Sequence, residues 1–378
     1  MESEYKYIFD IAIILLAANV GGIISKKLNQ PEVLGQIIIG IILGASFMTK
    51  TALIEEIGQI GVVLLMFIAG LETEVDELKE SGKSSSLIAL GGVLVPGILI
   101  SLATYFITRN FNASLFMGVV GTATSVSISV QTLKEIRRLR SKEGISILGA
   151  AIIDDVAGII MLTITVGVLK PSAGGSLFNV ISKIVLFFII VLIIGKVLKT
   201  LLIKLNKVVS IDKKIVSFAL ILCLGLAFLS EELGVAAITG AFFSGVLFSM
   251  TKYQHKISHE INQLANNFFI PIFFVAIGMS VNIFEAISAI KIGSVIILIA
   301  ILSKVIGSGI GAKLSGFSSE QSLQIGIGMV PRAEVAIIIA NLGLSIGLIN
   351  NKMMATTILM VVITTLITPS LLKWSFER

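Results

Sequence analysis

The chain consists mainly of apolar runs that are each about as long as a membrane-spanning helix. We count about 13 of them, roughly at 8–25, 31–48, 57–71, 86–107, 113–133, 144–169, 177–203, 214–230, 232–249, 266–282, 289–312, 321–345 and 353–372. About 20 helical residues cover the roughly 30 Å hydrocarbon core of a bilayer. Apolar residues make up 55% of the chain and charged residues 14%, with a mean hydropathy of +1.02, which is unlike a soluble domain. The sequence therefore predicts an all-α polytopic membrane protein with about 13 transmembrane helices.

The distribution of basic residues predicts the orientation of the chain. Of the 29 Lys and Arg residues, 20 follow odd-numbered runs and 7 lie on the opposite side. Loops rich in Lys and Arg stay in the cytoplasm. We therefore expect a multi-pass protein of the cell membrane with its N-terminus outside and its C-terminus in the cytoplasm. The two remaining basic residues, Lys304 and Arg332, fall inside apolar runs.

Two adjacent acidic residues, Asp154 and Asp155, lie near the middle of the run 144–169. A charge at that depth costs roughly 2.5–3.5 kcal/mol on insertion scales. Neighbouring residues of a helix point about 100° apart, so one carboxylate can face another helix while the other faces a cavity. Two interpretations follow: a structural ion-pair site, or a site for an ion or a proton.

Three short segments recur at a nearly constant offset. Segment 34–40 resembles 239–245, 67–71 resembles 275–279, and 114–118 resembles 322–326, at offsets of 205, 208 and 208. The offset spans seven helices, an odd number, so the second copy lies upside down relative to the first. Inverted repeats are typical of secondary transporters. We expect one membrane unit over 1–378 without a soluble regulatory domain, with repeat one at about 8–169, a linker helix at about 177–203 and repeat two at about 214–372.

Two runs in matching positions of the repeats carry signals for interrupted helices. Segment 121–129 is rich in small and hydroxylated residues and includes Thr124 and Ser125. Its counterpart, 326–334, contains Pro331, which removes a helical donor and clashes with the preceding turn. Broken helices in matching positions of two halves indicate the binding site of a transporter. Close packing of Ser and Thr between helices is the alternative for the first segment.

The remaining buried charges need partners. We expect Arg332 and Glu334 to compensate charge beside the broken helix, because buried charges are paired. Lys304 has no acidic residue within four positions. Its partner must come from another helix, and Asp154 or Asp155 is the leading candidate.

Together these residues resemble the sodium/proton antiporters, most closely the NapA-like Asp-Asp branch of the cation:proton antiporter superfamily. The resemblance covers nearly the whole chain and rests on segments 30–35, 67–72, 122–125 and 328–334, with Asp154, Asp155 and Lys304. It implies a homodimer in membrane lipid, in which a core domain with two crossed discontinuous helices moves against a dimerisation domain. It also implies that Asp155 binds Na⁺ or protons and that Asp154 pairs with Lys304. Thr124 and Ser125 match positions near the family's ion site.

We therefore expect a secondary antiporter, not an enzyme, that exchanges protons for monovalent cations by alternating access and carries net charge. Na⁺ is the expected cation and Li⁺ a second one, with no cofactor. A K⁺/H⁺ antiporter and a Na⁺-coupled solute symporter on the same fold are the alternatives; a symporter needs further polar or aromatic contacts, and the chain has only four Tyr and one Trp. The net charge of +6 reflects topology rather than nucleic acid. The polar segment 251–266 is expected on the cytoplasmic membrane surface.

Overall fold

A computed structural model describes residues 5–46, 48–74, 76, 80–170, 176–208, 214–280 and 290–377. The helices in chain order are α1 (Lys6–Lys27), α2 (Glu32–Ser46), α3 (Ala52–Leu71), α5 (Gly82–Thr108), α6 (Phe111–Thr122), α7 (Val126–Glu135), α8 (Lys142–Leu169), α9 (Leu177–Val208), α10 (Ile215–Glu232), α11 (Ala237–Ser249), α12 (Gln254–Leu264), the π-helix η2 (Ala265–Phe269), α13 (Ile270–Met279), α15 (Ile290–Leu314), α16 (Ser319–Gly328), α17 (Glu334–Ser345) and α18 (Asn351–Glu377).

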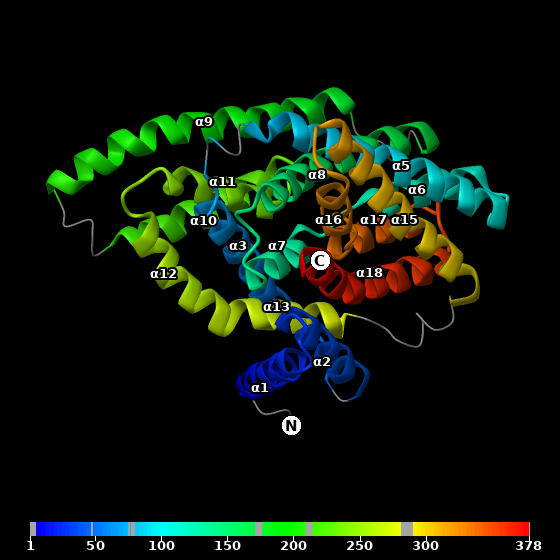
Figure 1. Cartoon of the computed structure of the whole chain (residues 1–378), viewed down its shortest axis with the longest axis horizontal. Coiled ribbons are helices and arrows are strands. Elements are labelled where there is room, and N and C mark those ends of the chain that lie inside the picture. The colour runs from blue at the N-terminus through cyan, green and yellow to red at the C-terminus, as the bar shows by residue number, and fades with distance from the viewer. Residues whose placement is uncertain are drawn as a thin grey trace.

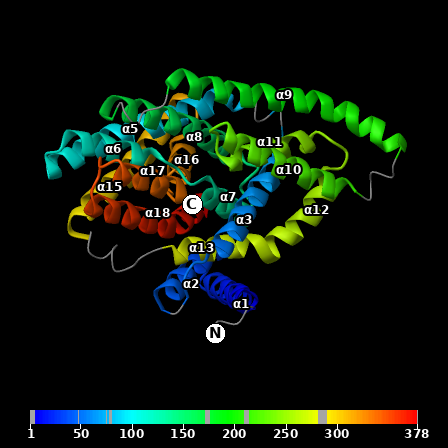
Figure 2. The same cartoon turned by 180° about the vertical axis from the view of Figure 1, so that it is seen from behind.

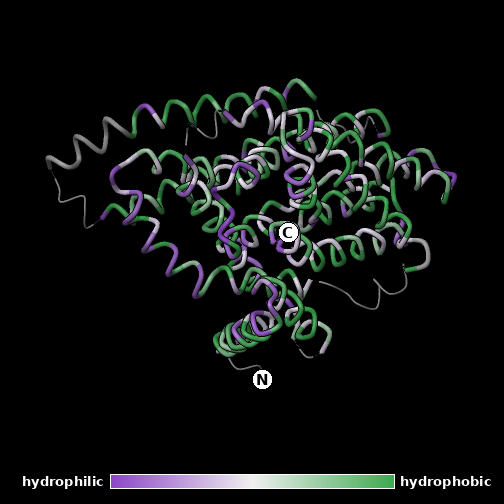
Figure 3. The backbone as a smooth tube through the Cα atoms, viewed as in Figure 1, coloured by the Kyte–Doolittle hydropathy of each residue, from purple (hydrophilic) through white to green (hydrophobic). Residues whose placement is uncertain are grey.

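The helices have the length and surface of membrane spans. Ten stretches of helix in the described residues are long and apolar enough to cross a bilayer, and three apolar helices are shorter. Large apolar side chains are exposed on them, for example Leu16 on α1 and Leu192 on α9, each at 67%, and Figure 3 shows hydrophobic residues along most of the helices. In a bilayer these side chains face lipid, and the helices satisfy their own backbone groups. The expected all-α membrane fold is confirmed.

The polar segment 251–266, which we expected on the cytoplasmic membrane surface, is mostly helical. It forms α12, which continues through η2 directly into α13, so that one helix runs from Gln254 to Met279. Ile257 and Ile261 are buried on one side of α12. The π-turn lies beside Pro271, near the start of α13, where a missing N–H disturbs the regular ladder.

The helices form two bundles, which Figures 1 and 2 show from opposite sides. The core bundle contains α5–α8 and α15–α18, and the flanking bundle contains α1–α3 and α10–α13; the long helix α9 contacts α8 and α11 and so links the two. The closest packing inside the core bundle joins α5 to α15, and that inside the flanking bundle joins α3 to α11 and α2 to α13.

Two broken helices cross at the centre of the core bundle. The first is interrupted between α6 and α7 by residues 123–125, and the second between α16 and α17 by residues 329–333. The Ser125 N–H donates to the Pro331 carbonyl at 2.6 Å, and the Ser129 hydroxyl donates to the Gly328 carbonyl at 2.5 Å. Each break therefore supplies partners for the other, as non-helical backbone at membrane depth requires. The predicted pair of crossed discontinuous helices is confirmed.

Glycine contacts in the flanking bundle reflect the repeat. Gly40 on α2 lies against Gly278 on α13, and Gly70 on α3 lies against Gly245 on α11. The offset of 205 relates Gly40 to Gly245, and the offset of 208 relates Gly70 to Gly278. The repeat therefore converts the first of these contacts into the second. A Cβ at any of these positions would collide with the backbone of the facing helix, so glycine is what allows the close approach.

We predict that Gly245→Ala destabilises the protein, because its Cβ would meet the Phe67 carbonyl. Overpacking of this kind costs about 1–3 kcal/mol. Gly225→Ala is the matched control, since it lies on neighbouring α10 and a Cβ there meets no atom within 4 Å. That variant should keep or raise the melting temperature, because Ala is the better helix former. Thermal denaturation of the purified proteins in detergent measures both; equal melting temperatures would contradict the contact.

Candidate functional site

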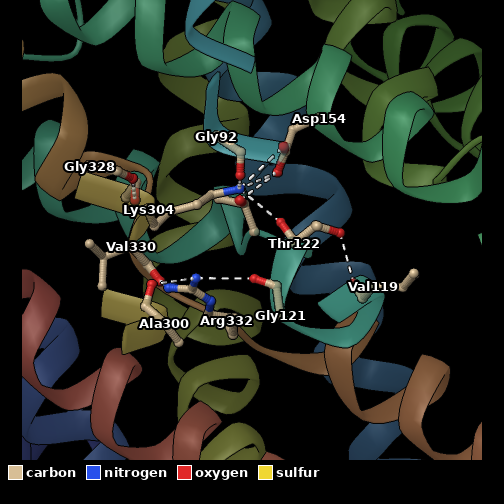
Figure 4. A network of polar contacts seen from close by, with 12 residues as sticks. Gly92, Val119, Gly121, Thr122, Asp154, Ala300, Lys304, Gly328, Val330 and Arg332 are labelled. Carbon is tan, nitrogen blue, oxygen red and sulfur yellow. Dashed lines mark hydrogen bonds and ion pairs between the residues drawn. The ribbon is translucent and has the colours of Figure 1, made fainter. Parts of the chain in front are cut away.

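A buried ion pair lies beside the helix crossing (Figure 4). The Lys304 ammonium lies 3.0 Å from Oδ2 and 3.2 Å from Oδ1 of Asp154. Lys304 is 0% and Asp154 2% exposed. The Lys304 ammonium also donates to the carbonyls of Gly92 at 2.7 Å and Thr122 at 2.8 Å. The ammonium thus has an anion and two dipoles around it in place of water, which a buried charge requires.

The local backbone explains why both carbonyls are available. Pro96 lies inside α5, four residues after Gly92, and proline has no N–H to donate to that carbonyl. Thr122 is the last residue of α6, where carbonyls have no intrahelical partner. Gly92 also allows the close approach of α15, since a Cβ there would lie 2.6 Å from the Ser308 hydroxyl. Pro96 was a signal in the sequence for this acceptor, and sequence reasoning missed it.

Arg332 lies in the second break and is 0% exposed. Its guanidinium donates to the carbonyls of Gly121 at 3.1 Å and Ala300 at 3.0 Å, and to that of Val330 (Figure 4). Two of these carbonyls lie at or near the C-terminal ends of α6 and α16, where a positive charge is favourable. The expected partner Glu334 begins α17, but its side chain lies outside the described part of the structure.

Two threonines of α18 hold the backbone of Arg332. The Arg332 N–H donates to the Thr364 hydroxyl at 3.2 Å, and the Thr365 hydroxyl donates to the Arg332 carbonyl at 2.7 Å. All three residues are buried. These hydroxyls satisfy a non-helical segment that would otherwise leave polar groups unpaired. Nothing in the sequence distinguished them from other helical threonines.

The hydroxylated residues of the first break have separate partners. The Thr124 hydroxyl donates to Oδ2 of Asp154 at 2.5 Å. The Ser125 hydroxyl lies 3.2 Å from that of Ser127. Thr124 therefore joins the ion pair of Asp154, and Ser125 lies next to it on the crossing backbone.

Asp155 lies on the wall of a cavity of about 720 Å³ between the two bundles. It is 8% exposed. The lining comes from both bundles and comprises Glu56, Gln59, Ile60, Val62, Val63, Ala123, Asp154, Asp155, Gly158, Ile159, Leu162, Leu224, Glu231, Gly234, Val235, Ala236, Ala237, Ile238, Val335, Ile338 and Ile339. The exposed residues Glu56, Glu231 and Gly234 place its mouth at the end of the molecule that carries the α10–α11 turn.

The cavity contains three polar residues that sequence reasoning missed: Glu56, Gln59 and Glu231. Glu56 and Gln59 lie in the N-terminal half of α3, and Glu231 lies at the C-terminal end of α10; their position facing a cavity was not readable from the sequence. The rest of the lining is mostly aliphatic. No group of three or more His, Cys, Asp or Glu side chains suited to a metal ion occurs within the described ranges.

We predict that Lys304→Ala destabilises the protein by about 3–5 kcal/mol, because it leaves Asp154 buried without its cation. Adding Asp154→Asn should recover part of the loss. Thermal denaturation in detergent measures the stabilities of the two single variants and the double variant. Lys313→Ala is the control: it alters an exposed site on the same helix and should leave the melting temperature nearly unchanged. Strictly additive losses for the two substitutions would argue against a coupled pair.

Comparison with known proteins agrees with this arrangement. Residues 11–378 match the family described as sodium/hydrogen exchanger, transmembrane. The chain is 37% identical to the Na⁺/H⁺-K⁺ antiporter GerN of Bacillus cereus, over 99% of this chain and 97% of that protein. It is 34% identical to a Na⁺/H⁺ antiporter of Enterococcus hirae, over 99% of both.

A solved structure shows the same fold. The sodium proton antiporter MjNhaP1 of Methanocaldococcus jannaschii superposes with a TM-score of 0.75 at 17% identity, over 99% of this chain and 97% of that one. The resemblance to sodium/proton antiporters seen in the sequence is confirmed, and the chain belongs to the transmembrane sodium/hydrogen exchanger family.

Proposed function

We propose that this protein is a secondary antiporter that exchanges Na⁺, and also Li⁺, for protons by alternating access. One observation carries the proposal: of two adjacent carboxylates, Asp154 is held by Lys304 and Thr124, while Asp155 lies on the wall of the cavity between the bundles. Family membership supports the same activity. Asp155 is then the shared carrier, because a carboxylate binds either a proton or a small cation.

The surroundings of Asp155 suit this competition. A hard cation prefers oxygen ligands such as carboxylates and carbonyls, and Asp155 supplies a carboxylate among mostly aliphatic lining residues. Asp154, Thr124 and Ser125 complete the proposed ion site, with Thr124 acting through Asp154, whose oxygen it contacts. Arg332, with Glu334, balances the charge of the broken helices.

The ion pair offers a route to a second proton. A cation at Asp155 lies beside Asp154, competes with Lys304 for the negative charge of Asp154 and so weakens that ion pair. Lys304 is fully buried, and an ammonium without its anion in that setting favours release of a proton. Two protons then move against one cation, and the cycle carries net charge.

K⁺/H⁺ exchange is the second candidate, because the Bacillus cereus relative GerN is a Na⁺/H⁺-K⁺ antiporter by name. The Na⁺-coupled symporter is less well supported, since no aromatic side chain is among the described residues that line the cavity. The positive-inside rule places the N-terminus outside and the C-terminus in the cytoplasm, so the cavity mouth faces outward. We also propose a homodimer in the cell membrane, as the family resemblance implies.

Asp155→Asn should fold and bind no exchangeable proton, and so should show no cation-driven proton movement. The measurement is a pH dye inside proteoliposomes given Na⁺, Li⁺ or K⁺ salts, with Glu320→Gln on the surface of α16 as the control variant. Undiminished exchange in Asp155→Asn would overturn the carrier assignment. A response to K⁺ alone would select the K⁺/H⁺ alternative.

A membrane potential should change the rate, because two positive charges move against one. Inside-negative liposomes should release Na⁺ faster than liposomes without a potential, as protons enter, and inside-positive liposomes should release it more slowly. Tracer Na⁺ efflux and the pH dye, read together, give the ratio of ions. One-for-one movement that ignores the potential would exclude the two-proton cycle and leave antiport itself intact.

A further inference from the structure

The boundary between the two bundles differs at its two ends. At one end lies the cavity that reaches Asp155. At the other end, three charged side chains of the core bundle hydrogen-bond to the flanking bundle: Glu135, Lys134 and Lys373. We call these three residues the latch.

Glu135 makes the most specific of these contacts. Its Oε2 accepts the N–H of Glu32 at 2.5 Å, and its Oε1 accepts the N–H of Val33 at 3.2 Å. Glu32 and Val33 are the first residues of α2, whose N–H groups have no intrahelical partner. The residue before them is Pro31, which has no side-chain acceptor to cap the helix. A carboxylate from the core bundle therefore caps a helix of the flanking bundle, with support from the helix dipole.

The two lysines of the latch also reach from the core bundle to oxygen atoms of the flanking bundle. Lys134 donates to the Asn262 side chain on α12 at 2.6 Å. Lys373, near the end of α18, donates to the carbonyl and side-chain oxygens of Asn29 at 2.6 and 2.8 Å. Asn29 has a φ of 56°, the left-handed conformation that asparagine tolerates, and this turn between α1 and α2 presents both oxygens. Three helices of the flanking bundle are thus held at one end.

The latch is linked rigidly to the candidate ion site. Glu135 ends α7, and α7 begins at Val126 directly after the break at 123–125. The bonds of Ser125 and Ser129 to the second broken helix fix α7 within the core bundle. A ten-residue helix is about 15 Å long, so the site and the latch lie at the two ends of one stiff element.

We propose that Glu135, together with Lys134 and Lys373, holds the bundles closed at the α7 end, so that Asp155 faces the other side while the latch is made. The latch must open before Asp155 reaches the α7 side. Glu135 is a positioning residue in this scheme, which rests on the proposed alternating access. Removing its contacts shifts the protein toward the conformation in which the cavity is closed.

The test is the accessibility of the cavity to a membrane-impermeant thiol reagent. Gly158→Cys supplies the reporter, because Gly158 lines the cavity one turn from Asp155 and a Cβ there meets no atom within 4 Å. Cys223 is the single cysteine and is buried, so the unsubstituted chain gives the background. Intact cells and inside-out vesicles are both labelled, and the preparation in which the reporter reacts identifies the face of the mouth.

Glu135→Ala should shift the equilibrium away from the open cavity by about tenfold, since hydrogen bonds to a charged group are worth at least that factor, and should slow labelling from that face by up to the same factor. Glu135→Gln should give an intermediate rate, because it keeps one acceptor oxygen. Glu143→Ala is the matched control: Glu143 accepts a bond of 2.6 Å from Gln321, but both residues belong to the core bundle, so the labelling rate should not change.

An unchanged or faster rate in folded Glu135→Ala overturns the latch, and so does an equal slowing in Glu143→Ala. If Glu135→Ala does not yield folded protein, Lys373→Ala replaces it, with slower labelling expected and an unchanged rate overturning the proposal. Labelling does not depend on which ion is carried. Loss of the proposed exchange function would therefore appear in the proteoliposome assays and failure of the latch in the labelling rate.

Discussion

The ion pair of Asp154 and Lys304 is the interaction around which the core bundle is arranged. An ammonium and a carboxylate at membrane depth are stable only when each has its partners within reach. Lys304 receives one carboxylate and the carbonyls of Gly92 and Thr122. These partners lie on α8, α5 and α6, so the pair fixes four helices of the core bundle against one another.

The neighbouring acid has a different environment because of helix geometry. Asp154 and Asp155 are adjacent on α8, and adjacent residues cannot point in the same direction. Once Asp154 points to Lys304, Asp155 is directed to the boundary between the bundles, where the cavity lies. In the proposed mechanism this geometry gives Asp154 a structural role and Asp155 the exchange role, and the two remain close enough to influence each other electrostatically.

The boundary between the bundles has mostly aliphatic contacts around the cavity and charged contacts at the α7 end, and this combination suits motion of one bundle against the other. Around the cavity the facing surfaces are mostly aliphatic, and such surfaces slide without leaving buried charges unpaired. At the α7 end the contacts are charged and lie at helix ends, where water can replace them when they part. The stiff helix α7 connects these two regions.

The sequence by itself determined the class of fold and the interrupted helices, and it singled out Asp154, Asp155 and Lys304 as charged residues inside apolar runs. Apolar length, proline and a charge inside an apolar run are local properties, and the constraint of the bilayer makes them decisive. The offset of 205–208 residues likewise indicated the inverted repeat. The residues alone left open which acid meets Lys304, although the family resemblance implied Asp154, and the tertiary structure decided it. Only the tertiary structure showed that Arg332 donates to backbone carbonyls and that Glu135 caps α2 from about 100 residues away. These contacts join helices distant in the chain, and their geometry depends on how each helix is rotated and placed, which periodicity alone does not specify.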